Sequence, residues 1–514
     1  MTKQAAVTPP AAAKEDQRAA RLAVTMSTIA FTICFAVWMM NGVLVTYLDD
    51  AQLFAFSQGQ FGWLIGVPVL TGALARLPFG ILADRYGGRR VFTLLMFGAA
   101  LPTYMLGSVT TVNGFFWVSL GFGVTGASFA VGVTYIASWY RDRGIGTALG
   151  IFGAGNAGAA VTSILGPRLL SWLTDEGRRP EGWRDFPRIY AGALVLTAML
   201  FYLTTRERRS HTADDRPLAQ RLAPLKNMRV WRFGLYYFVV FGGFVALSQW
   251  MLPYYVNVYE MPLATAGLLA AVFSFPSGVV RAFGGWLSDR LGARRVMYWV
   301  LGAILLCCLA LCVPRMKILT PGRGVMAKRQ GVVTAIDERA ITVDQRRYPY
   351  RAPPTSEPPA TTSSLGLLPS VTSEHAVLVK VGDAVARRDL LARGTTRIDF
   401  AANVWVFTTL VLILGIAMGI GKAAVYRHIP DYFPDSVGVT GGIVGVLGGL
   451  GGFVCPILFG ELLRLTGLWT SCWMFLAAVT FAALVWMHLV IQRLLAERAP
   501  ELSQVFERPR AEPS

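Results

Sequence analysis

The chain has 514 residues, of which 54% are hydrophobic and only 15% charged, and its formal net charge is +18. Soluble domains carry about 25% charged residues, so this composition excludes an ordinary soluble enzyme and indicates a membrane protein with many spans. The six cysteines and four histidines form no CxxC pair and no histidine cluster, so we expect no metal site and no disulfide framework.

Apolar runs of about 20 residues, the length that crosses a bilayer, predict twelve membrane-spanning helices. These are expected at 25–48, 61–83, 90–108, 113–138, 143–168, 187–204, 232–256, 264–288, 295–314, 402–421, 436–462 and 468–492. Two six-helix bundles follow, 25–204 and 232–314 with 402–492. They are separated by a linker at 205–231, interrupted by an insert at 315–401, and flanked by a disordered tail at 1–24 and a tail at 493–514.

The basic residues are distributed by side of the membrane. They crowd the tails, the central linker and the loops near Arg89, Arg141 and Arg294, whereas loops 49–60 and 257–263 contain none. This alternation is the positive-inside pattern. It predicts an inner-membrane protein with both termini in the cytoplasm, and it accounts for the net charge without a nucleic-acid partner.

Two arginines, Arg76 and Arg281, stand in apolar runs, each eight residues before the aspartate of a repeated loop motif. The copies read Gly80-x-x-x-Asp84-Arg85-x-Gly87-x-Arg89-Arg90 and Gly285-x-x-x-Asp289-Arg290-x-Gly292-x-Arg294-Arg295. A helix rises 1.5 Å per residue, so both arginines are expected about 12 Å from the loop, near the middle of the bilayer. We expect no Lys, Asp or Glu at that depth. An ionisable group there indicates a functional site, and a symmetric pair predicts one small anion held between two halves. The alternative is that the arginines snorkel to the membrane surface or donate to backbone carbonyls.

A second repeat is rich in glycine. It places Gly150, Gly153, Gly155 and Gly158 in the fifth predicted span and Gly442, Gly445, Gly448 and Gly449 in the eleventh, with Asn156 inside the first copy. Glycine bares the backbone for close helix packing and for approach to a ligand. We expect these helices to line the pore, with the Asn156 amide donating to the anion.

The insert carries β-like runs at 331–337, 340–343 and 376–381 around a Pro/Ser/Thr-rich stretch at 352–373. The span count places it outside the cytoplasm. The run Val379-Lys-Val-Gly382-Asp resembles a turn of barrel-sandwich domains, but no Met-Lys-Met carrier site is present. We therefore expect a small β-rich decoration without an attached cofactor, or a docking module for an unknown partner.

Together, the loop motif and the paired glycine segments resemble the major facilitator superfamily and, within it, its nitrate/nitrite porter family. The resemblance implies an all-α fold of twelve spanning helices in two pseudo-symmetric bundles. It also implies that Arg76 and Arg281 bind nitrate or nitrite, that Tyr237 is a donor and Phe241 a gate, and that Phe129 stacks on the anion. Asp84, Arg85 and Arg89, with Asp289, Arg290 and Arg294, would form a cytoplasmic gating loop.

The expected function is nitrate/nitrite antiport by alternating access, because proton symport needs a titratable group and none is expected near the arginines. Alternatives are a proton-coupled nitrate symporter, a carrier of another small anion, and a membrane sensor with a ligand-binding insert. An enzyme is not expected, since the sequence offers no nucleophile–base pair and no phosphate-binding loop. We expect a monomer.

Overall fold

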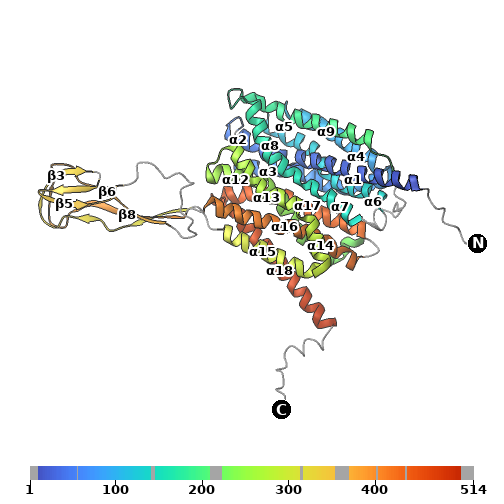
Figure 1. Ribbon diagram of the computed structural model, residues 1–514. Coiled ribbons are helices and arrows are strands. Elements are labelled where there is room, and N and C mark those ends of the chain that lie inside the picture. The colour runs from blue at the N-terminus through green and yellow to red at the C-terminus, as the bar shows by residue number, and fades with distance from the viewer. Residues whose placement is uncertain are drawn as a thin grey trace, which may run out of the picture. The chain divides into compact units, whose positions relative to one another are not determined.

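The computed structural model of the protein describes residues 10–54, 56–140, 145–208, 223–312, 316–337, 339–352, 370–400, 403–433 and 437–498 (Figure 1). The chain divides into two compact units. One comprises Met1–Cys312 with Thr408–Ser514, and the other Val313–Phe407. Most of the central linker, of the Pro/Ser/Thr-rich stretch and of the C-terminal tail lies outside the described residues.

The larger unit is helical and consists of two halves. The first half contains α1 (Pro10–Trp38), α2 (Met40–Asp50), α3 (Gln58–Tyr86), α4 (Gly88–Leu106), α5 (Val112–Phe122), η1 (Gly123–Ala127), α6 (Ser128–Trp139), α7 (Ile145–Gly153), η2 (Ala154–Ala157), α8 (Gly158–Leu173), η3 (Pro180–Arg184) and α9 (Asp185–Thr204). The second contains η4 (Ala223–Lys226), α11 (Met228–Tyr237), η5 (Phe238–Gly242), α12 (Gly243–Tyr259), α13 (Leu263–Val279), α14 (Arg281–Leu291), α15 (Ala293–Leu311), α16 (Val404–Tyr432), α17 (Val437–Thr466) and α18 (Ser471–Arg498).

Ten helices within the described ranges are long and apolar enough to cross a membrane, and the pair α13–α14, bent by 46°, makes an eleventh. The remaining span of the twelve expected corresponds to α4, which is 19 residues long and carries two arginines in its first turn. Residues 10–24 differ from the expectation of disorder, because α1 is helical from Pro10 onward. Large apolar side chains such as Trp172 and Leu203 are 74% and 77% exposed, as suits helices that face lipid.

The glycine of the loop motif links consecutive spans in both halves. Gly87 has φ 97°, where α3 ends and α4 begins, and Gly292 has φ 85° between α14 and α15. A side chain is strained at such positive φ values, whereas glycine adopts them readily. The repeated motif therefore specifies the same sharp turn twice.

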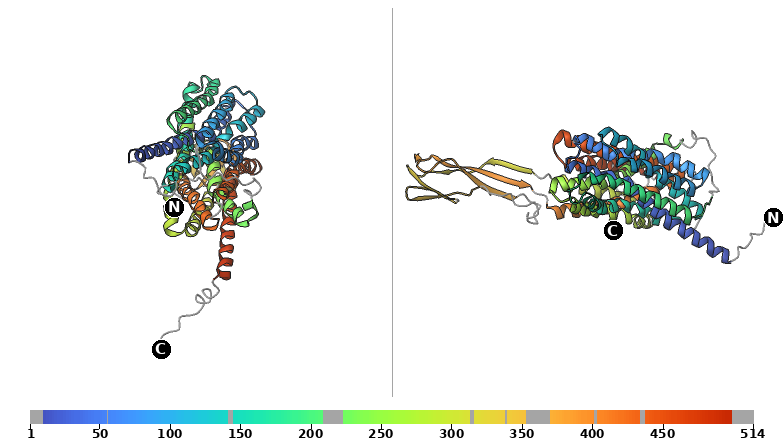
Figure 2. Two further views of the ribbon diagram at one scale, coloured as in Figure 1. Left: turned by 90° about the vertical axis from the view of Figure 1, so that its right-hand side faces the viewer. Right: turned by 90° about the horizontal axis from the view of Figure 1, so that it is seen from above.

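The halves pack against each other through bare backbone. Figures 1 and 2 show α3, α8, α13 and α17 between the outer helices of the two halves. On the α3–α17 contact, a Cβ at Gly66 would lie 2.8 Å from the Phe453 carbonyl oxygen, and on the α8–α13 contact a Cβ at Gly267 would overlap the Ser163 carbonyl. Small residues permit this close approach between membrane helices.

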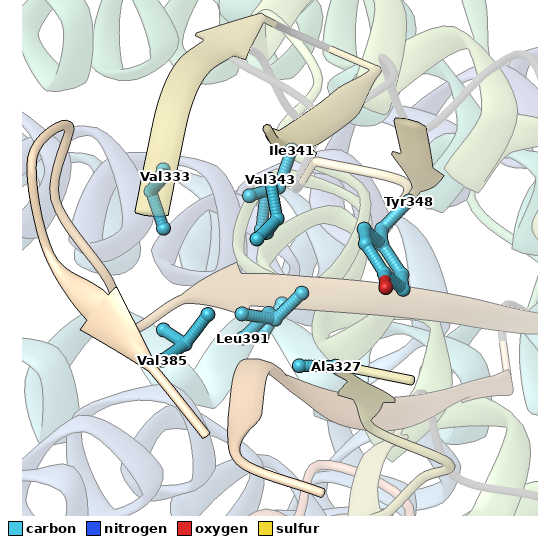
Figure 3. Packing of buried hydrophobic residues seen from close by; sticks show 8 residues of the cluster. Ala327, Val333, Ile341, Val343, Tyr348, Val385 and Leu391 are labelled. Atoms are coloured by element: carbon cyan, nitrogen blue, oxygen red, sulfur yellow. The ribbon is translucent and has the colours of Figure 1, made fainter. Parts of the chain in front are cut away.

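The smaller unit contains antiparallel strands in two sheets, ordered β1-β8-β2, with β6 also paired to β8, and β5-β4-β3-β7. The strands are β1 (Met316–Pro321), β2 (Val325–Met326), β3 (Gly331–Asp337), β4 (Ala340–Val343), β5 (Arg346–Pro349), β6 (Ser370–Val377), β7 (Ala384–Val385) and β8 (Leu390–Phe400). Buried side chains including Val333, Ile341 and Leu391 form its core (Figure 3). The first two expected β runs coincide with β3 and β4, whereas the third extends past the end of β6.

Candidate functional site

Arg76 lies inside the helical unit, on α3, and is only 5% exposed. Its Nε donates to the carbonyl oxygen of Gly126 at 3.3 Å, and its Nη1 donates to the carbonyl oxygen of Gly445 at 2.9 Å. Gly126 belongs to η1 in the first half, and Gly445 belongs to α17 in the second. The guanidinium therefore joins the two halves through two neutral acceptors, and neither acceptor neutralises its positive charge.

Aromatic rings flank the same guanidinium. Its central carbon lies 4.7 Å from the centroid of the Phe241 ring and 5.6 Å from that of Trp38. The Trp38 indole packs against Gly72 and Gly126, and its Nε1 donates to the Pro68 carbonyl oxygen at 2.9 Å. Ring faces attract cations, so these contacts hold Arg76 without neutralising it.

Arg281 is the second expected anion ligand and stands at the first position of α14, directly after the bend that follows α13. Its central carbon lies 5.0 Å from the Phe129 ring and 5.8 Å from the Tyr426 ring. Its Nη1 is buried and has no hydrogen-bond partner among the described residues. A buried donor without an acceptor costs free energy, so a bound anion would satisfy a group that the protein leaves open.

A continuous set of rings connects the two arginines: Tyr426 lies over Arg281 and packs against Tyr237, and Tyr237 stacks on the Phe241 ring beside Arg76. In the described part of the chain, neither arginine forms an ion pair with a carboxylate. The pair is also asymmetric, because Arg76 donates to carbonyls on both sides whereas Arg281 keeps an unused Nη1. Two buried like charges repel, and a small anion between them would relieve that repulsion.

The expected aromatic residues gather around this pair. Tyr237 stacks on Phe241 with ring centroids 4.9 Å apart and an interplanar angle of 6°. Phe129, from the first half, packs against Phe31 and Phe152 at 5.5 and 5.7 Å between ring centroids. All three expected aromatic side chains therefore lie at the site, although their roles stay predictions.

Sequence reasoning missed Tyr426, on α16. Its ring packs edge-on against Tyr237 at 5.0 Å, and its hydroxyl donates to the Gly441 carbonyl oxygen at 3.1 Å. It thereby links the Tyr237 ring to Arg281 and to α17. One signal could have found it: Tyr426 follows the last residue of the predicted tenth span by five positions.

Several of these groups lie where spanning helices depart from α geometry. Gly126 lies in the 3₁₀ segment η1 and Asn156 in the 3₁₀ segment η2, while Phe241 lies in η5, a π-helical segment. Short 3₁₀ and π segments free or redirect backbone groups and are frequent at functional sites. The site is thus built from interrupted helices of both halves.

Some glycines of the two repeats lie close to the arginines or to Tyr237, and others do not. A Cβ at Gly153 would lie 3.2 Å from Arg281 Cδ, one at Gly449 would lie 3.5 Å from Arg76 Nη1, and one at Gly448 would overlap the Tyr237 ring. By contrast, Gly442 faces open space, and Gly150 has an ordinary contact at 3.6 Å with Ala282 Cβ. Gly155 and Gly158 accommodate Phe31 and the Thr32 carbonyl of α1, so these two serve packing.

Asn156 is fully buried, and neither atom of its side-chain amide forms a hydrogen bond within the described residues. A buried amide is almost always paired in folded proteins. The unused amide agrees with the expectation that it donates to a ligand. It is the one amide in the glycine repeats, because the second copy has glycines at the corresponding positions.

The expectation of no lysine near the arginines is wrong. Helix α16 continues to Tyr432 instead of ending at residue 421, and it carries Lys422, which is 0% exposed. Its Nζ lies 3.5 Å from the centroid of the Phe244 ring, and Tyr426, four residues further along the helix, lies over Arg281. The predicted span stopped at the first basic residue, whereas the helix continues through it.

The loop motif contacts neighbouring helices. Asp289 Oδ1 accepts from Arg427 Nε at 2.6 Å, so the second copy of the motif pairs with α16. Arg89 donates through Nε to the Tyr202 carbonyl oxygen at 3.1 Å. The Glu207 carboxylate accepts from the backbone N–H groups of Arg89 and Arg90, which caps α4.

The other residues assigned to the gating loops lie on α3, α14 and α15. Asp84 is half-buried on α3, while Arg85 and Arg290 are exposed and lie over the rings of Tyr86 and Trp286. Arg294 Nη2 donates to the Tyr432 hydroxyl at 3.4 Å. A gating role for these residues stays a prediction.

Comparisons with known proteins agree with this architecture. The family model of the Major Facilitator Superfamily matches residues 26–321. A protein of Thermus thermophilus named "Probable nitrate/nitrite antiporter NarK1" is 38% identical over 498 residues, covering 96% of this chain and 97% of that protein. The "Nitrite extrusion protein" of Bacillus subtilis (strain 168) is 23% identical over 471 residues, covering 90% of this chain and 94% of that protein.

Solved structures show the same fold at low identity. A bacterial homologue of the lysosomal transporter Spinster, inward-facing and occupied, superimposes with a TM-score of 0.57 at 16% identity, covering 90% of this chain and 96% of that one. A point mutant of the nucleoside transporter NupG also gives 0.57, at 13% identity, covering 91% and 99%. The chain therefore belongs to the major facilitator superfamily and, within it, to the nitrate/nitrite porter family.

Proposed function

We propose that the protein transports nitrate and nitrite across the membrane by alternating access, exchanging one anion for the other. One observation carries this proposal: two guanidinium groups from equivalent positions of the two halves, Arg76 buried and Arg281 half-buried, lie among aromatic rings, and Arg281 retains a buried, unused Nη1. The similarity to proteins named as nitrate/nitrite, nitrite and nitrate transporters supports nitrate and nitrite as the anions.

The chemistry of the site suits a small planar oxyanion. Guanidinium is planar, keeps its proton and offers parallel donors that match two oxygens of one anion. The Phe129 and Phe241 rings lie beside the two guanidinium groups and restrict the space to a thin ligand. Arg281 Nη1 and the Asn156 amide are the open donors that we assign to the anion oxygens.

Alternating access follows from how the halves are joined. Arg76 reaches the Gly445 carbonyl across the interface, and glycines of α3, α13 and α17 allow close contact between the halves. We propose that the halves rock around the anion, as in other carriers built from parallel repeats. A site filled by an anion has less internal repulsion than an empty one, so the loaded carrier reorients more readily. This favours exchange over net flow.

We also propose that the protein acts as a monomer in the bacterial inner membrane, with both termini in the cytoplasm. The basic tails and loops support this orientation through the positive-inside rule. Its relatives are transporters rather than enzymes, and we propose the same for this chain. Tagging either terminus and measuring reactivity in spheroplasts tests the orientation, and labelling from outside would contradict it.

Counterflow in proteoliposomes tests the function. Vesicles loaded with nitrite should accumulate labelled nitrate, and vesicles loaded with gluconate should accumulate far less. If vesicles loaded with nitrite accumulate no more labelled nitrate than vesicles loaded with gluconate, the proposal is contradicted. Competition by phosphate, formate or a dicarboxylate stronger than that by nitrite would identify a carrier of another anion.

A further inference from the structure

Lys422 is a buried cation in the helical unit that the proposed exchange does not use. It lies on α16 and is 0% exposed, and its Nζ is 3.5 Å from the centroid of the Phe244 ring. Within the described residues, Nζ has no hydrogen-bond partner. An ammonium group removed from water is costly unless it is paired, so a lysine held in this way needs an explanation.

The helix geometry places this lysine beside the anion site. Tyr426, which packs against Tyr237 and lies over Arg281, is four residues further along α16. Residues four apart share one face of a helix. Lys422 therefore faces the same interior as Tyr426, one helical turn away, and the Tyr426 ring centroid lies 5.8 Å from the central carbon of Arg281.

The other neighbours of Lys422 are uncharged. Helix α12 presents the Phe244 ring, and Phe244 in turn packs against Phe35 of α1 and Phe273 of α13 at 6.4 and 5.7 Å between ring centroids. The adjacent Gly421 faces Val240 of η5 and Val300 of α15. Within the described residues, the charged group identified beside this face of α16 is Arg281, whose central carbon lies 5.8 Å from the Tyr426 ring centroid.

Lysine and arginine respond differently to such surroundings. Arginine keeps its proton in proteins, whereas a buried lysine changes its protonation state readily. With the anion site empty, Arg281 opposes a proton on Lys422 by like-charge repulsion. With an anion at Arg281, that repulsion is offset, and the negative charge favours the ammonium form.

We propose that Lys422 takes up one proton as the anion binds between the arginines and releases it when the site empties. In this step an O–H bond of a hydronium ion breaks and an N–H bond forms at the Nζ lone pair, which leaves one water molecule and an ammonium group. The inference rests on the proposed function and deepens it, because it makes the lysine a positioning residue for the same anion. By linkage, a proton on Lys422 tightens anion binding by the same factor as the anion favours the proton.

The exchange and net modes of transport then differ in their dependence on protons. During nitrate/nitrite exchange, each direction carries one anion and one proton, so exchange is proton-neutral. Net entry of an anion brings one proton with it. The empty carrier reorients with Lys422 neutral. Repulsion in the empty site then comes from Arg76 and Arg281 alone, without a third positive charge on Lys422.

The first test measures nitrate affinity of the full-length protein in detergent as a function of pH. For the wild type, affinity should tighten roughly tenfold from mildly alkaline to mildly acidic solution, within the range usual for coupled sites. Lys422→Met should bind weakly at all pH values, and Lys422→Arg should bind tightly with no pH dependence. Lys226→Met changes an exposed lysine in η4 and should behave as the wild type.

The second test counts protons directly, and its first measurement, on the wild type, does not depend on the folding of a variant. Nitrate is added in weakly buffered solution with a pH indicator dye, and the protons bound per nitrate are counted. Uptake approaching one proton, lost in Lys422→Arg, supports the inference. Nitrate binding without proton uptake, and with the same pH profile in Lys422→Met, would overturn it while leaving nitrate transport intact. Absence of nitrate binding at every pH would overturn the proposed function itself.

Discussion

Arg76 uses two different nitrogens for two carbonyl oxygens, and this geometry predicts that a lysine cannot replace it. Its Nε and Nη1 point to Gly126 and Gly445 from one rigid plane. A lysine ammonium is a single point charge and cannot hold both carbonyls while facing an anion. We expect Arg76→Lys to weaken nitrate binding by at least about tenfold, a loss of roughly 1.4 kcal/mol.

Isothermal titration with nitrate measures that effect. Arg178→Lys is the matched control, because Arg178 is exposed and forms an ion pair with the exposed Asp175. Unchanged nitrate affinity in Arg76→Lys would contradict a direct role for the fork-shaped group.

A substitution at Asn156 can distinguish a ligand-binding role of its amide from a structural role. Its amide is buried and has no partner among the described residues, and a buried polar group without a partner costs about 1–3 kcal/mol. Replacing Asn156 with leucine, which has a similar branched shape, should therefore leave Tm unchanged or raise it, while nitrate affinity falls. A thermal melt with and without nitrate measures both. A lower Tm with unchanged affinity would assign the amide to packing instead.

The sequence is most informative where a single residue type has a large energetic effect, such as a charge within an apolar run. A charge in an apolar run identified Arg76 and Arg281, and their surroundings contain the aromatic residues that the resemblance implied. The hydropathy pattern does not identify Lys422 and Tyr426 as part of a membrane span, because the apolar run ends where the first charged residue appears. A buried lysine is too rare for hydropathy to distinguish it from the start of a loop.

At the scale of the element, helix α17 contains two glycines at which an added methyl group should have very different effects on transport. A Cβ at Gly448 would overlap the Tyr237 ring, which stacks on Phe241, whereas a Cβ at Gly442 meets nothing within 4 Å. Overpacking costs about 1–3 kcal/mol. Gly448→Ala should therefore abolish most nitrate counterflow, and Gly442→Ala should preserve it.

The comparison is made in proteoliposomes at equal protein content. Equal counterflow in the two variants would show that the Tyr237 ring can shift without consequence, and would contradict its placement as a fixed donor at the site.

The positions of the helices could be predicted, but their interruptions could not. Length and hydropathy predicted most spans, and the motif glycines Gly87 and Gly292 coincide with positive-φ turns. The segments η1, η2 and η5 depend on packing between helices that are distant in sequence, and single-sequence periodicity carries no record of it. The Asp289–Arg427 ion pair, which spans 138 positions, was missed for the same reason.

At the scale of the whole molecule, the two compact units predict that transport does not need the strand-rich insert. Every residue assigned to the anion lies in the helical unit. Strands β1 and β8 pair antiparallel up to Pro321 and Thr395, and the Gly322 N–H donates to the Gly394 carbonyl oxygen at 2.8 Å. Residues 323–393 can therefore be replaced by an Asn-Gly hairpin turn.

This shortened chain should exchange nitrate for nitrite at the wild-type rate in proteoliposomes. Loss of exchange in a monodisperse variant would contradict independent units and would make the insert part of the transport cycle. Retained exchange with a new growth defect in cells would point to a separate partner for the insert.

The hydrogen bond from Arg76 to Gly445 joins residues 369 positions apart, and this separation has a consequence for how the protein is made. The ribosome delivers the donor to the bilayer long before it delivers the acceptor. Until α17 inserts, the nascent first half carries a cation whose final acceptor does not yet exist. A chain that stalls before that point carries Arg76 without its second-half acceptor, so a buried guanidinium remains incompletely hydrogen-bonded until the last helices are in place.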